Sequence, residues 1–585
     1  MPRLVKRALP LLALCTTVLA IGACGSSNNE GGAAATVDDG SGGQRGGTLT
    51  LLTSQDIQSL DPGITYGSLD LNLLSATVRT LSAYAPDNPT DIQPDLAASA
   101  PQVSPDGKTL TVRIRRGVKF GPPVNREVTS RDVKYAIERG FNPHVANAYA
   151  STYYGDVVGA ARATGGPIAG IQTPDDQTLV FKLTRPTASL LAQATVLPLS
   201  APVPPEYAKP FDAKSPSTYG NHLVASGPYM VAADRDGDVL GNGYVPGRSV
   251  RLVRNPNWSA ATDDRPAYVN EVDFRIGGSS TVSGRQVLAG DGLVLGDSPT
   301  PALVKKAYQT ARDQIFFSPG AGSRYAALNT AIPPFDDANL RKAVAAALDR
   351  EQMRRIRGGE IVGDIASHFL YPGVLGFEEA GGLDGTGVDF LANPQGDRAL
   401  AARYMRAAGY PDGRYTGDET IQVVGLAGAP DSNDAQILDQ TLQDLGFKTQ
   451  LKLVDVSVMY GRFCGVPRAR VHVCPNVGWI RDFADPQTVL DVAFNGKYIF
   501  PENNPNWPQL DDPAINRAMA RGEVTVGDQA RADAWGAIDR QVTATGAAIP
   551  WLYDRQPNVF SADVRCVPEL WNQGHCDFAY TSLKK

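Results

Sequence analysis

Cys24 is the residue with the most specific chemistry in this chain. It closes the tetrad Ile-Gly-Ala-Cys at 21–24, behind an apolar run at 8–20 and three basic side chains within the first seven residues. This arrangement is typical of a secretory signal peptide, and the run is too short, and too broken by Pro10, to remain as a membrane span. We therefore predict cleavage after residue 23 and a Cys24 thiol that carries diacylglycerol. The alternatives are an ordinary secretory peptide with a chance cysteine, or a simple membrane anchor.

Four further cysteines form two pairs whose members are ten positions apart, Cys464 with Cys474 and Cys566 with Cys576. An exported chain lies in a compartment where disulfides persist, so this spacing predicts two local bridges. Closing loops this short contributes about 2–3 kcal/mol each in the chain-entropy model. The alternative is a zinc site, because His472 lies two residues from Cys474, but a paired Cys-x-x-Cys is missing.

The other reactive side chains match no motif for catalysis or for a cofactor. Gly296-Asp297-Ser298 resembles the nucleophile block of one esterase family, but it lies far inside the chain and no histidine follows in that pattern. The chain lacks the phosphate-binding loop Gly-x-x-x-x-Gly-Lys-Ser/Thr, the zinc motif His-Glu-x-x-His and Cys-x-x-Cys. Its five histidines are scattered, at 144, 222, 368, 472 and 575. We expect a protein that is not an enzyme and that holds no cofactor and no metal.

The composition indicates a mildly acidic globular body on a flexible tether. Residues 24–47 are rich in glycine, serine and asparagine and lack the apolar content to fold. The remaining residues, about 540, have room for two to four domains. The chain is 42% hydrophobic with a net charge of −6, which becomes −9 without the three cations of the signal. This charge argues against nucleic acid as a partner, and no later stretch approaches the length of a membrane span.

The first half of the body alternates turns with strands and helices. A turn at Pro105 leads into a strand of alternating polar and apolar residues that ends at Arg115. Thr129 and Ser130 are placed to cap a helix, and a second turn and strand follow at 174–183. This mixture is typical of an α+β region.

The second half predicts helices and strands in the order of a parallel sheet. Alanine and leucine recur at helical spacing over 336–356, and a later helix at 397–408 ends before a glycine. The sequence then predicts a strand at 420–426, a helix at 434–445 and a strand at 448–454, which is a βαβ unit. We expect an α/β protein with α+β parts.

Eight short segments follow one another along about 430 residues of the body. They include Ser-Pro-Asp-Gly-Lys-Thr at 104–109 and Trp-Ile-Arg-Asp-Phe-Ala-Asp-Pro at 479–486. The eight lie at 59–62, 94–97, 104–109 with 116–120, 227–229, 254–258, 328–330 with 333–337, 340–343 and 479–486. In this order they resemble the family 5 extracellular solute-binding proteins of ABC importers, typified by bacterial oligopeptide- and dipeptide-binding proteins. Each segment alone is a weak signal, and the ordered set is a specific one.

Three features depart from the family pattern. The loop Gly121–Val128 replaces the shorter Asp-Gly-x-Pro that commonly follows the position of Phe120. The pair at 566 and 576 is not a general family feature. Asn476 stands two places before Gly478, where the oligopeptide-binding relative carries an arginine, and this weakens a direct assignment to peptides.

The resemblance implies a two-lobed fold of the periplasmic-binding-protein type, with an extra inserted domain and a ligand cleft between lobes. Domain I would comprise 48–72, 200–316 and 550–585, domain II 73–199, and domain III 317–549. The chain would cross between lobes at Phe316–Gly322 and Gly546–Trp551, where glycines suit a hinge.

The resemblance also implies a ligand site around Asp482, whose counterpart in peptide-binding relatives pairs with the ligand's α-ammonium. Val477, Gly478 and Trp479 would bond the ligand backbone as an added strand, which gives affinity without regard to the ligand's side chains. Phe483 and Arg481 lie beside them and complete the candidate site. The alternative for Asp482 is a turn or cap residue before the Asp-Pro at 485–486.

Outside this segment two questions stay open. Tyr153 and Tyr154 are read either as cleft-lining or as core aromatics. The cation for a ligand carboxylate is not determined, and Arg481 could equally be a solvated neighbour of Asp485.

The resemblance predicts a monomeric substrate-binding protein of an ABC importer, anchored outside the cytoplasmic membrane by lipidated Cys24. It would capture a peptide by domain closure and deliver it to permease and ATPase subunits. Nickel chelates, opines and oligosaccharides are alternative ligands within the family. A sensor or a cell-envelope assembly lipoprotein on the same scaffold is the alternative function.

Overall fold

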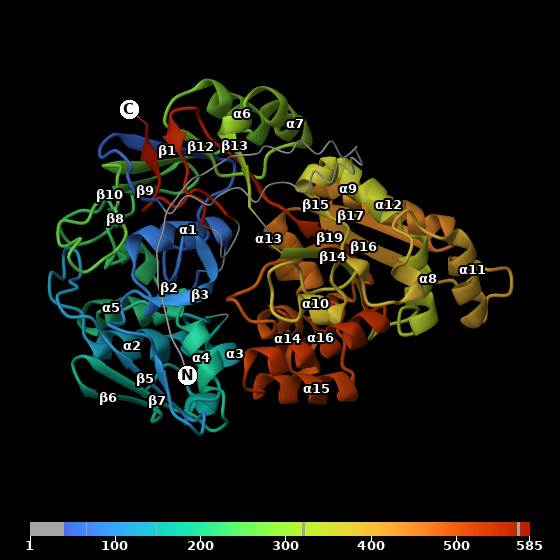
Figure 1. The fold of residues 1–585 in the computed structure, drawn as a ribbon, viewed down its shortest axis with the longest axis horizontal. Coiled ribbons are helices and arrows are strands. Elements are labelled where there is room, and N and C mark those ends of the chain that lie inside the picture. Colours follow the sequence, from blue (N-terminus) through green and yellow to red (C-terminus); the bar gives the residue numbers. More distant parts are fainter. Residues whose placement is uncertain (1–39, 66, 148, 319–321, 570–573, 585) are drawn as a thin grey trace, which may run out of the picture. The chain divides into compact units, whose positions relative to one another are not determined.

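The computed structural model describes residues 40–65, 67–147, 149–318, 322–569 and 574–584. Three sheets organise them, and we name each after one strand: β1 (Thr48–Thr53), β5 (Thr109–Arg113) and β14 (Gly322–Leu328) (Figure 1). The predicted signal peptide and Cys24 lie outside the described residues. Within the described part, no helix has both the length and the apolar character that a membrane crossing requires.

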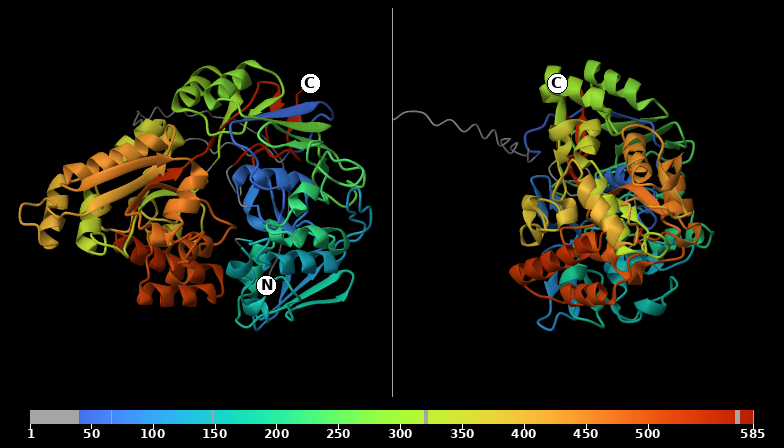
Figure 2. Two further views of the ribbon diagram at one scale, coloured as in Figure 1. Left: turned by 180° about the vertical axis from the view of Figure 1, so that it is seen from behind. Right: turned by 90° about the vertical axis from the view of Figure 1, so that its right-hand side faces the viewer.

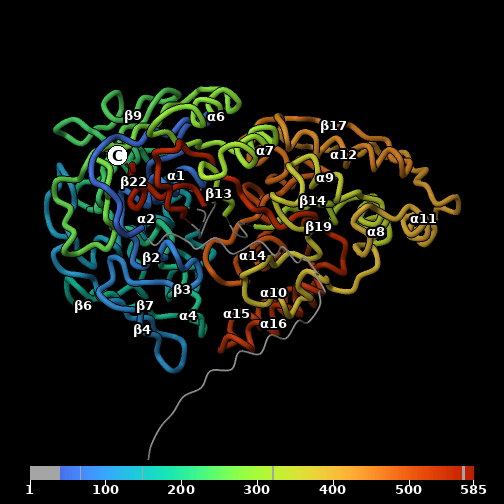
Figure 3. The backbone as a smooth tube through the Cα atoms, turned by 45° about the horizontal axis from the view of Figure 1, so that its top comes forward, coloured from blue at the N-terminus to red at the C-terminus, as the bar shows by residue number. Residues whose placement is uncertain are grey.

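The β1 sheet is built from the N-terminal part of the chain and shares its core with the C-terminal segment. Its strands are ordered β12 (Leu293–Leu295), β1, β11 (Glu271–Ile276), β10 (Ser249–Arg254), β8 (Tyr229–Val231), with β9 (Tyr244–Val245) beside β10. Leu49 and Phe274 share one core with Phe560 and Phe578. Figure 3 shows the red C-terminal segment beside the blue tube with which the described part of the chain begins. Accompanying elements are α1 (Ser68–Thr77), α5 (Pro205–Asp212), α6 (Ser280–Ala289), α7 (Pro301–Thr310), β21 (Val564–Arg565) and β22 (Ser582–Leu583).

The β5 sheet is antiparallel and confirms the strands predicted in the first half. Its order is β4 (Gln102–Val103), β5, β7 (Thr178–Lys182), β6 (Ile171–Asp175). Helix α2 (Ser130–Gly140) begins where the sequence predicted, because Thr129 and Asp132 form a capping box. The other elements are the hairpin β2 (Ser82–Ala85) and β3 (Asn88–Pro94), α3 (Ala150–Tyr154) and α4 (Ala188–Ala194).

The β14 sheet contains the predicted βαβ unit. Its order is β15 (Gly363–Asp364), β19 (Ala548–Asp554), β14, β18 (Val473–Trp479), β16 (Thr420–Leu426), β17 (Lys448–Val454). Strands β16 and β17 are parallel and α12 (Asp431–Asp444) connects them. Other helices are α8 (Ala338–Ala347), α9 (Arg350–Arg357), α10 (Phe377–Ala380), α11 (Arg398–Ala407), α13 (Val456–Val458), α14 (Gln487–Phe494), α15 (Pro513–Glu523) and α16 (Asp528–Ala544), the last three gathered beside one another in Figure 2.

The single helix predicted over 336–356 is wrong, because the structure has two helices there. Leu348 and Asp349 are extended between α8 and α9. The Asp349 carboxylate accepts a hydrogen bond from the Gln352 N–H at 2.7 Å, so it caps the N-terminus of α9. A capping aspartate inside an otherwise helical pattern starts a new helix.

Two of the predicted boundaries fall within paired elements. Residues 550–554, which we assigned to domain I, lie in β19 and pair with β14. Residues 555–556 connect β19 to β20 (Pro557–Val559), which pairs with β13 (Ile315–Phe317). The crossings predicted at 316–322 and 546–551 stay predictions. Residues Leu73 and Leu74 of α1 lie in the β1 core rather than in the β5 core. The division into three domains otherwise stays a prediction.

Both predicted disulfides are present. Cys464 is bonded to Cys474 and Cys566 to Cys576, with Cα atoms 6.3 and 5.1 Å apart. The alternative zinc site is wrong, since the bridge uses both sulfurs that it required. His472 instead accepts the Gln422 N–H at 3.1 Å through Nδ1.

Candidate functional site

The end of β18 is a strand segment paired on one side. Residues 477–479 lie opposite 323–325 of β14 in antiparallel register. On the other side, β16 is in register with β18 at Val473 alone, and Pro475 lacks the N–H that would continue a ladder. In the part of the chain that the structure describes, no strand pairs with the second edge of 477–479. An extended ligand could add there as a strand.

Gly478 is exposed. Because it has no Cβ, the side chain of Arg324 on the paired strand β14 can lie close to its backbone. A Cβ at this position would lie 3.2 Å from Nη1 and 3.6 Å from Cζ of Arg324. The guanidinium of Arg324 therefore folds over the backbone of Gly478, its partner in the register.

Asp482 follows this strand end and is 8% exposed. The Tyr153 hydroxyl donates a hydrogen bond to its Oδ2. The ring of Tyr153 packs edge-on against Phe483, with centroids 4.9 Å apart. Tyr153 thus contacts the predicted site, and Tyr154 is a core residue with 1% exposure.

Two more tyrosines position the loop that carries Asp482. The Tyr371 hydroxyl accepts the Arg481 N–H at 3.2 Å, and the Tyr84 hydroxyl accepts the Ala484 N–H at 2.9 Å. Fixed main-chain bonds on both sides of Asp482 restrict where its carboxylate can point.

For Asp482 we considered a structural role in the turn before a helix as the alternative to ligand binding. In the structure, Asp485 has contacts of this structural kind. Its carboxylate pairs with Arg531 at 2.6 Å and accepts the Gln487 N–H at 2.9 Å at the start of α14. Burial raises the pKa of Asp485, and the Arg531 guanidinium opposes that rise.

The remaining predicted residues lie around the strand end with different exposures. Val477 is buried in the core of the β14 sheet, and Phe483 is fully buried against Tyr153. Trp479 is half-buried, packs on the cores of both the β5 and the β14 sheets, and donates from Nε1 to the Thr488 carbonyl at 2.9 Å. Arg481 donates to the Pro89 carbonyl at 2.7 Å. Their contacts with a ligand stay predictions.

A cavity of about 170 Å³ lies at the open edge of this strand end. Its walls come from the ends of β14, β16, β18 and β19 and from the connection between β19 and β20 at 555–556. The lining residues are Gly322, Ser323, Arg324, Leu426, Tyr460, Asn476, Gly478, Trp479, Ile480, Asp554 and Gln556. We call this cavity the strand-end cavity.

Charged groups are concentrated beside the strand-end cavity. Arg324 donates from Nε to Asp554 and from Nη1 to Asn476 Oδ1 at 3.3 Å. Asn476 donates to Asp431. Burial works against the charge of Asp431, but neighbouring arginines hold its pKa below the usual value.

Behind them, Arg357 neutralises the start of α12. Its Nη1 lies 2.8 Å from Asp431 and 3.1 Å from Asp434. Burial raises the pKa of Asp434 to about 7 despite Arg357. Arg324, Asp554 and Arg357 were not predicted from the sequence, because only the register of β14 with β18 and β19 and the end of helix α9 bring them together.

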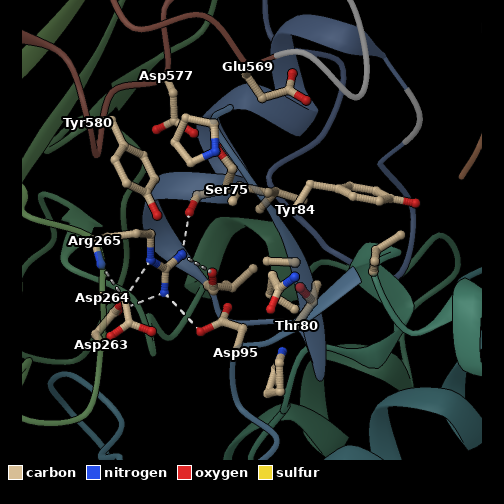
Figure 4. A pocket seen from close by; sticks show the side chains of 18 of the residues that line it. Ser75, Thr80, Tyr84, Asp95, Asp263, Asp264, Arg265, Glu569, Asp577 and Tyr580 are labelled. Carbon is tan, nitrogen blue, oxygen red and sulfur yellow. Dashed lines mark hydrogen bonds and ion pairs between the residues drawn. The ribbon is translucent and has the colours of Figure 1, made fainter. Parts of the chain in front are cut away.

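A larger cavity of about 360 Å³ lies beside α1 and the hairpin β2–β3 (Figure 4). One cation of its wall is paired within the cavity: Arg265 bonds Asp263 at 2.8 Å and donates to the Ser75 carbonyl at 2.6 Å. Burial opposes the charge of Asp263, but Arg265 beside it holds the pKa below its usual range. None of the predicted ligand residues lines this cavity, whereas Gly478 and Trp479 line the strand-end cavity. Asp482 and the other three predicted residues line neither cavity, and the ligand site around them stays a prediction.

Comparison with known proteins shows the family and the fold of the chain. The model of bacterial extracellular solute-binding proteins, family 5 middle, matches residues 91–500. The chain belongs to this family. Solute-binding proteins are a non-enzymatic class, and family 5 structures have the two-lobed α/β fold that the sequence predicted.

Three relatives show the extent of the likeness. Oligopeptide-binding protein OppA of Bacillus subtilis (strain 168) is 26% identical over 57% of this chain and 58% of that protein, so the match spans little more than half of that relative. Di/tripeptide-binding protein 2 of Pseudomonas aeruginosa (strain UCBPP-PA14) is 24% identical over 88% and 90%. The solved structure of clavulanic acid biosynthesis oligopeptide binding protein 2 has 28% identity and a TM-score of 0.79, and covers 93% of this chain and 96% of that one.

Proposed function

We propose that this family 5 protein is the substrate-binding component of an ABC importer and that its substrate is a peptide. The carrying observation is the placement of a buried carboxylate, Asp482, directly after a strand segment, 477–479, whose second edge lacks a partner strand among the described residues. The relatives named as oligopeptide- and di/tripeptide-binding proteins support the same substrate class.

The strand segment 477–479 and the carboxylate of Asp482 would bind different parts of the ligand. Main-chain groups of 477–479 bond the backbone of an extended ligand and are indifferent to its side chains. One carboxylate fixes polarity and register, since of the two ends of a peptide backbone only the α-ammonium carries a matching charge. Trp479 supplies an apolar wall beside them.

Delivery requires a membrane partner, and we propose that lipidated Cys24 holds the protein outside the cytoplasmic membrane beside permease and ATPase subunits. The motif at 21–24 supports the lipid anchor. A monomer with one ligand per chain suits this role.

The ligand that copurifies with the protein tests the proposed substrate class. We expect mass spectrometry of the denatured, purified protein to release peptides with free N-termini, and we expect those peptides to raise the melting temperature by mass action. Recovery of a sugar or a metal chelate alone, with no thermal response to any peptide, would contradict the proposal.

A further inference from the structure

The larger cavity, beside α1 and the hairpin β2–β3, has no part in the proposed peptide site. We call it the hairpin cavity. Its volume of about 360 Å³ lies in the range of small-molecule pockets. Apolar side chains form much of its wall, among them Leu71, Leu74, Val78, Ala83, Val196 and Pro198. The hairpin cavity therefore has the size and the lining of a site for a small organic molecule.

Acidic groups outnumber basic groups in the wall of the hairpin cavity. Two of the acids are neutralised by arginines: Asp95 pairs with Arg79 at 2.6 Å. Asp263 pairs with Arg265 at 2.8 Å. The other charged residues of the described wall are Asp264, Glu569, Asp577 and Arg115. Three further acids thus accompany one further arginine, and this excess of negative charge favours a cation as the occupant.

Asp577 is a buried acid of this wall without a cationic partner. It is 9% exposed, and its Oδ1 accepts the Ala579 N–H at 2.8 Å. Among the described residues, its Oδ2 has no hydrogen-bond partner and its carboxylate forms no ion pair. Burial raises the pKa of Asp577, although the Ala579 N–H and the charge of Arg265 oppose that rise. A ligand cation would supply the countercharge that a buried carboxylate needs.

Tyr580 places an aromatic ring in the same wall. Its N–H donates to the Asp577 carbonyl at 3.2 Å, and both side chains line the cavity (Figure 4). The face of an aromatic ring attracts cations, so a ring beside a carboxylate suits an organic ammonium. Within the described ranges, no group of three or more His, Cys, Asp or Glu side chains is placed to hold a metal ion.

We propose that the hairpin cavity binds a small organic ammonium ion, whose charge pairs with Asp577 and whose apolar body lies against the aliphatic wall. Tyr580 contributes its ring to the same charge. This inference goes beyond the proposed function and does not depend on it, because none of the predicted peptide-binding residues lines this cavity.

Calorimetry with phenethylammonium and its neutral counterpart phenethyl alcohol tests the site. We expect the wild type to bind the ammonium about tenfold or more tightly than the alcohol, because only the ammonium pairs with a buried carboxylate. In Asp577→Asn the two probes should bind alike, and asparagine keeps the acceptor for the Ala579 N–H. Asp236→Asn is the matched control, since Asp236 is 78% exposed and does not line the cavity.

Two further variants locate the probe. Ala83→Leu narrows the hairpin cavity without removing a charged group, and it should weaken the binding of phenethylammonium. Asp482→Ala removes the carboxylate proposed to bind a peptide's ammonium, and the affinity for phenethylammonium should stay as in the wild type. The pair distinguishes the hairpin cavity from the proposed peptide site.

Four results would overturn the inference. They are failure of the wild type to bind phenethylammonium, equal binding of the ammonium and the alcohol, undiminished binding to Asp577→Asn, and loss of binding in Asp482→Ala. The last result would place the probe in the proposed peptide site. Each of them leaves the proposed peptide-binding function standing.

Discussion

At the scale of single residues, two aspartates of one motif have different surroundings. Asp485 pairs with Arg531 and accepts the Gln487 N–H at the start of α14, whereas the Asp482 carboxylate accepts a hydrogen bond from the Tyr153 hydroxyl beside the open strand end. A carboxylate already paired with an arginine offers little to a ligand cation. The position of Asp485 therefore argues against it as the ligand-binding aspartate, and the proposed recognition of the ligand is assigned to Asp482.

The adjacent tyrosines 153 and 154 allow a matched test of this assignment. Tyr153→Phe removes a hydrogen bond to a charged carboxylate, and we expect it to weaken peptide binding by about 1.5–3 kcal/mol. Tyr154→Phe should leave affinity unchanged, because the Tyr154 hydroxyl has no partner within the described part of the chain. Calorimetry on both variants measures the difference, and equal affinities would contradict a role for Tyr153 at the site.

At the scale of elements, features that depend on neighbouring residues could be predicted from the sequence. The register between strands that lie far apart in the chain could not. The capping box at Thr129 and the βαβ order of 420–454 depend on neighbouring residues, and the structure contains both. The break at Asp349 was missed because alanine and leucine keep helical spacing across it. Arg324 could not be found from the sequence, since its place over Gly478 follows from a strand pair separated by about 150 residues.

The break between α8 and α9 makes a prediction about stability. Asp349→Ala removes the cap of α9, and we expect the free energy of unfolding to fall by about 1 kcal/mol. Asp349→Asn keeps a capping oxygen and should lose much less. Urea unfolding of the three proteins tests this, and equal stability of the alanine and asparagine variants would contradict the capping role.

At the scale of the whole molecule, contacts join the part of the chain that contains the β5 sheet to the loops that follow β18. Tyr84 meets Ala484, Pro89 meets Arg481, and Tyr153 meets Asp482. Arg185 adds an ion pair with Glu523 at 2.7 Å. The first three contacts involve the loop to which we assign the ligand, and the Arg185 pair with Glu523 of α15 joins the same part of the chain to its neighbour. All four contacts therefore favour the arrangement of the chain in which the proposed ligand would bind.

The Arg185 pair should therefore influence affinity from outside the site. Arg185→Gln is expected to weaken peptide binding by up to about fivefold at low salt, the range for partly exposed ion pairs. The difference should shrink at about 0.5 M salt because screening weakens the pair. Arg131→Gln is the control, since Arg131 pairs with Asp176 within the β5 region. Equal, salt-independent affinities of both variants would show that Arg185 has no part in the bound arrangement.

The most direct test of the central claim is calorimetry of the wild type and Asp482→Ala, each with a free and an N-acetylated tripeptide. We expect the substitution to cost about 2–5 kcal/mol of binding because it leaves an enclosed ammonium unpaired. Acetylation of the ligand should cause a similar loss in the wild type and little further loss in the variant. Equal affinities in all four titrations would contradict Asp482 as the partner of the ligand's ammonium.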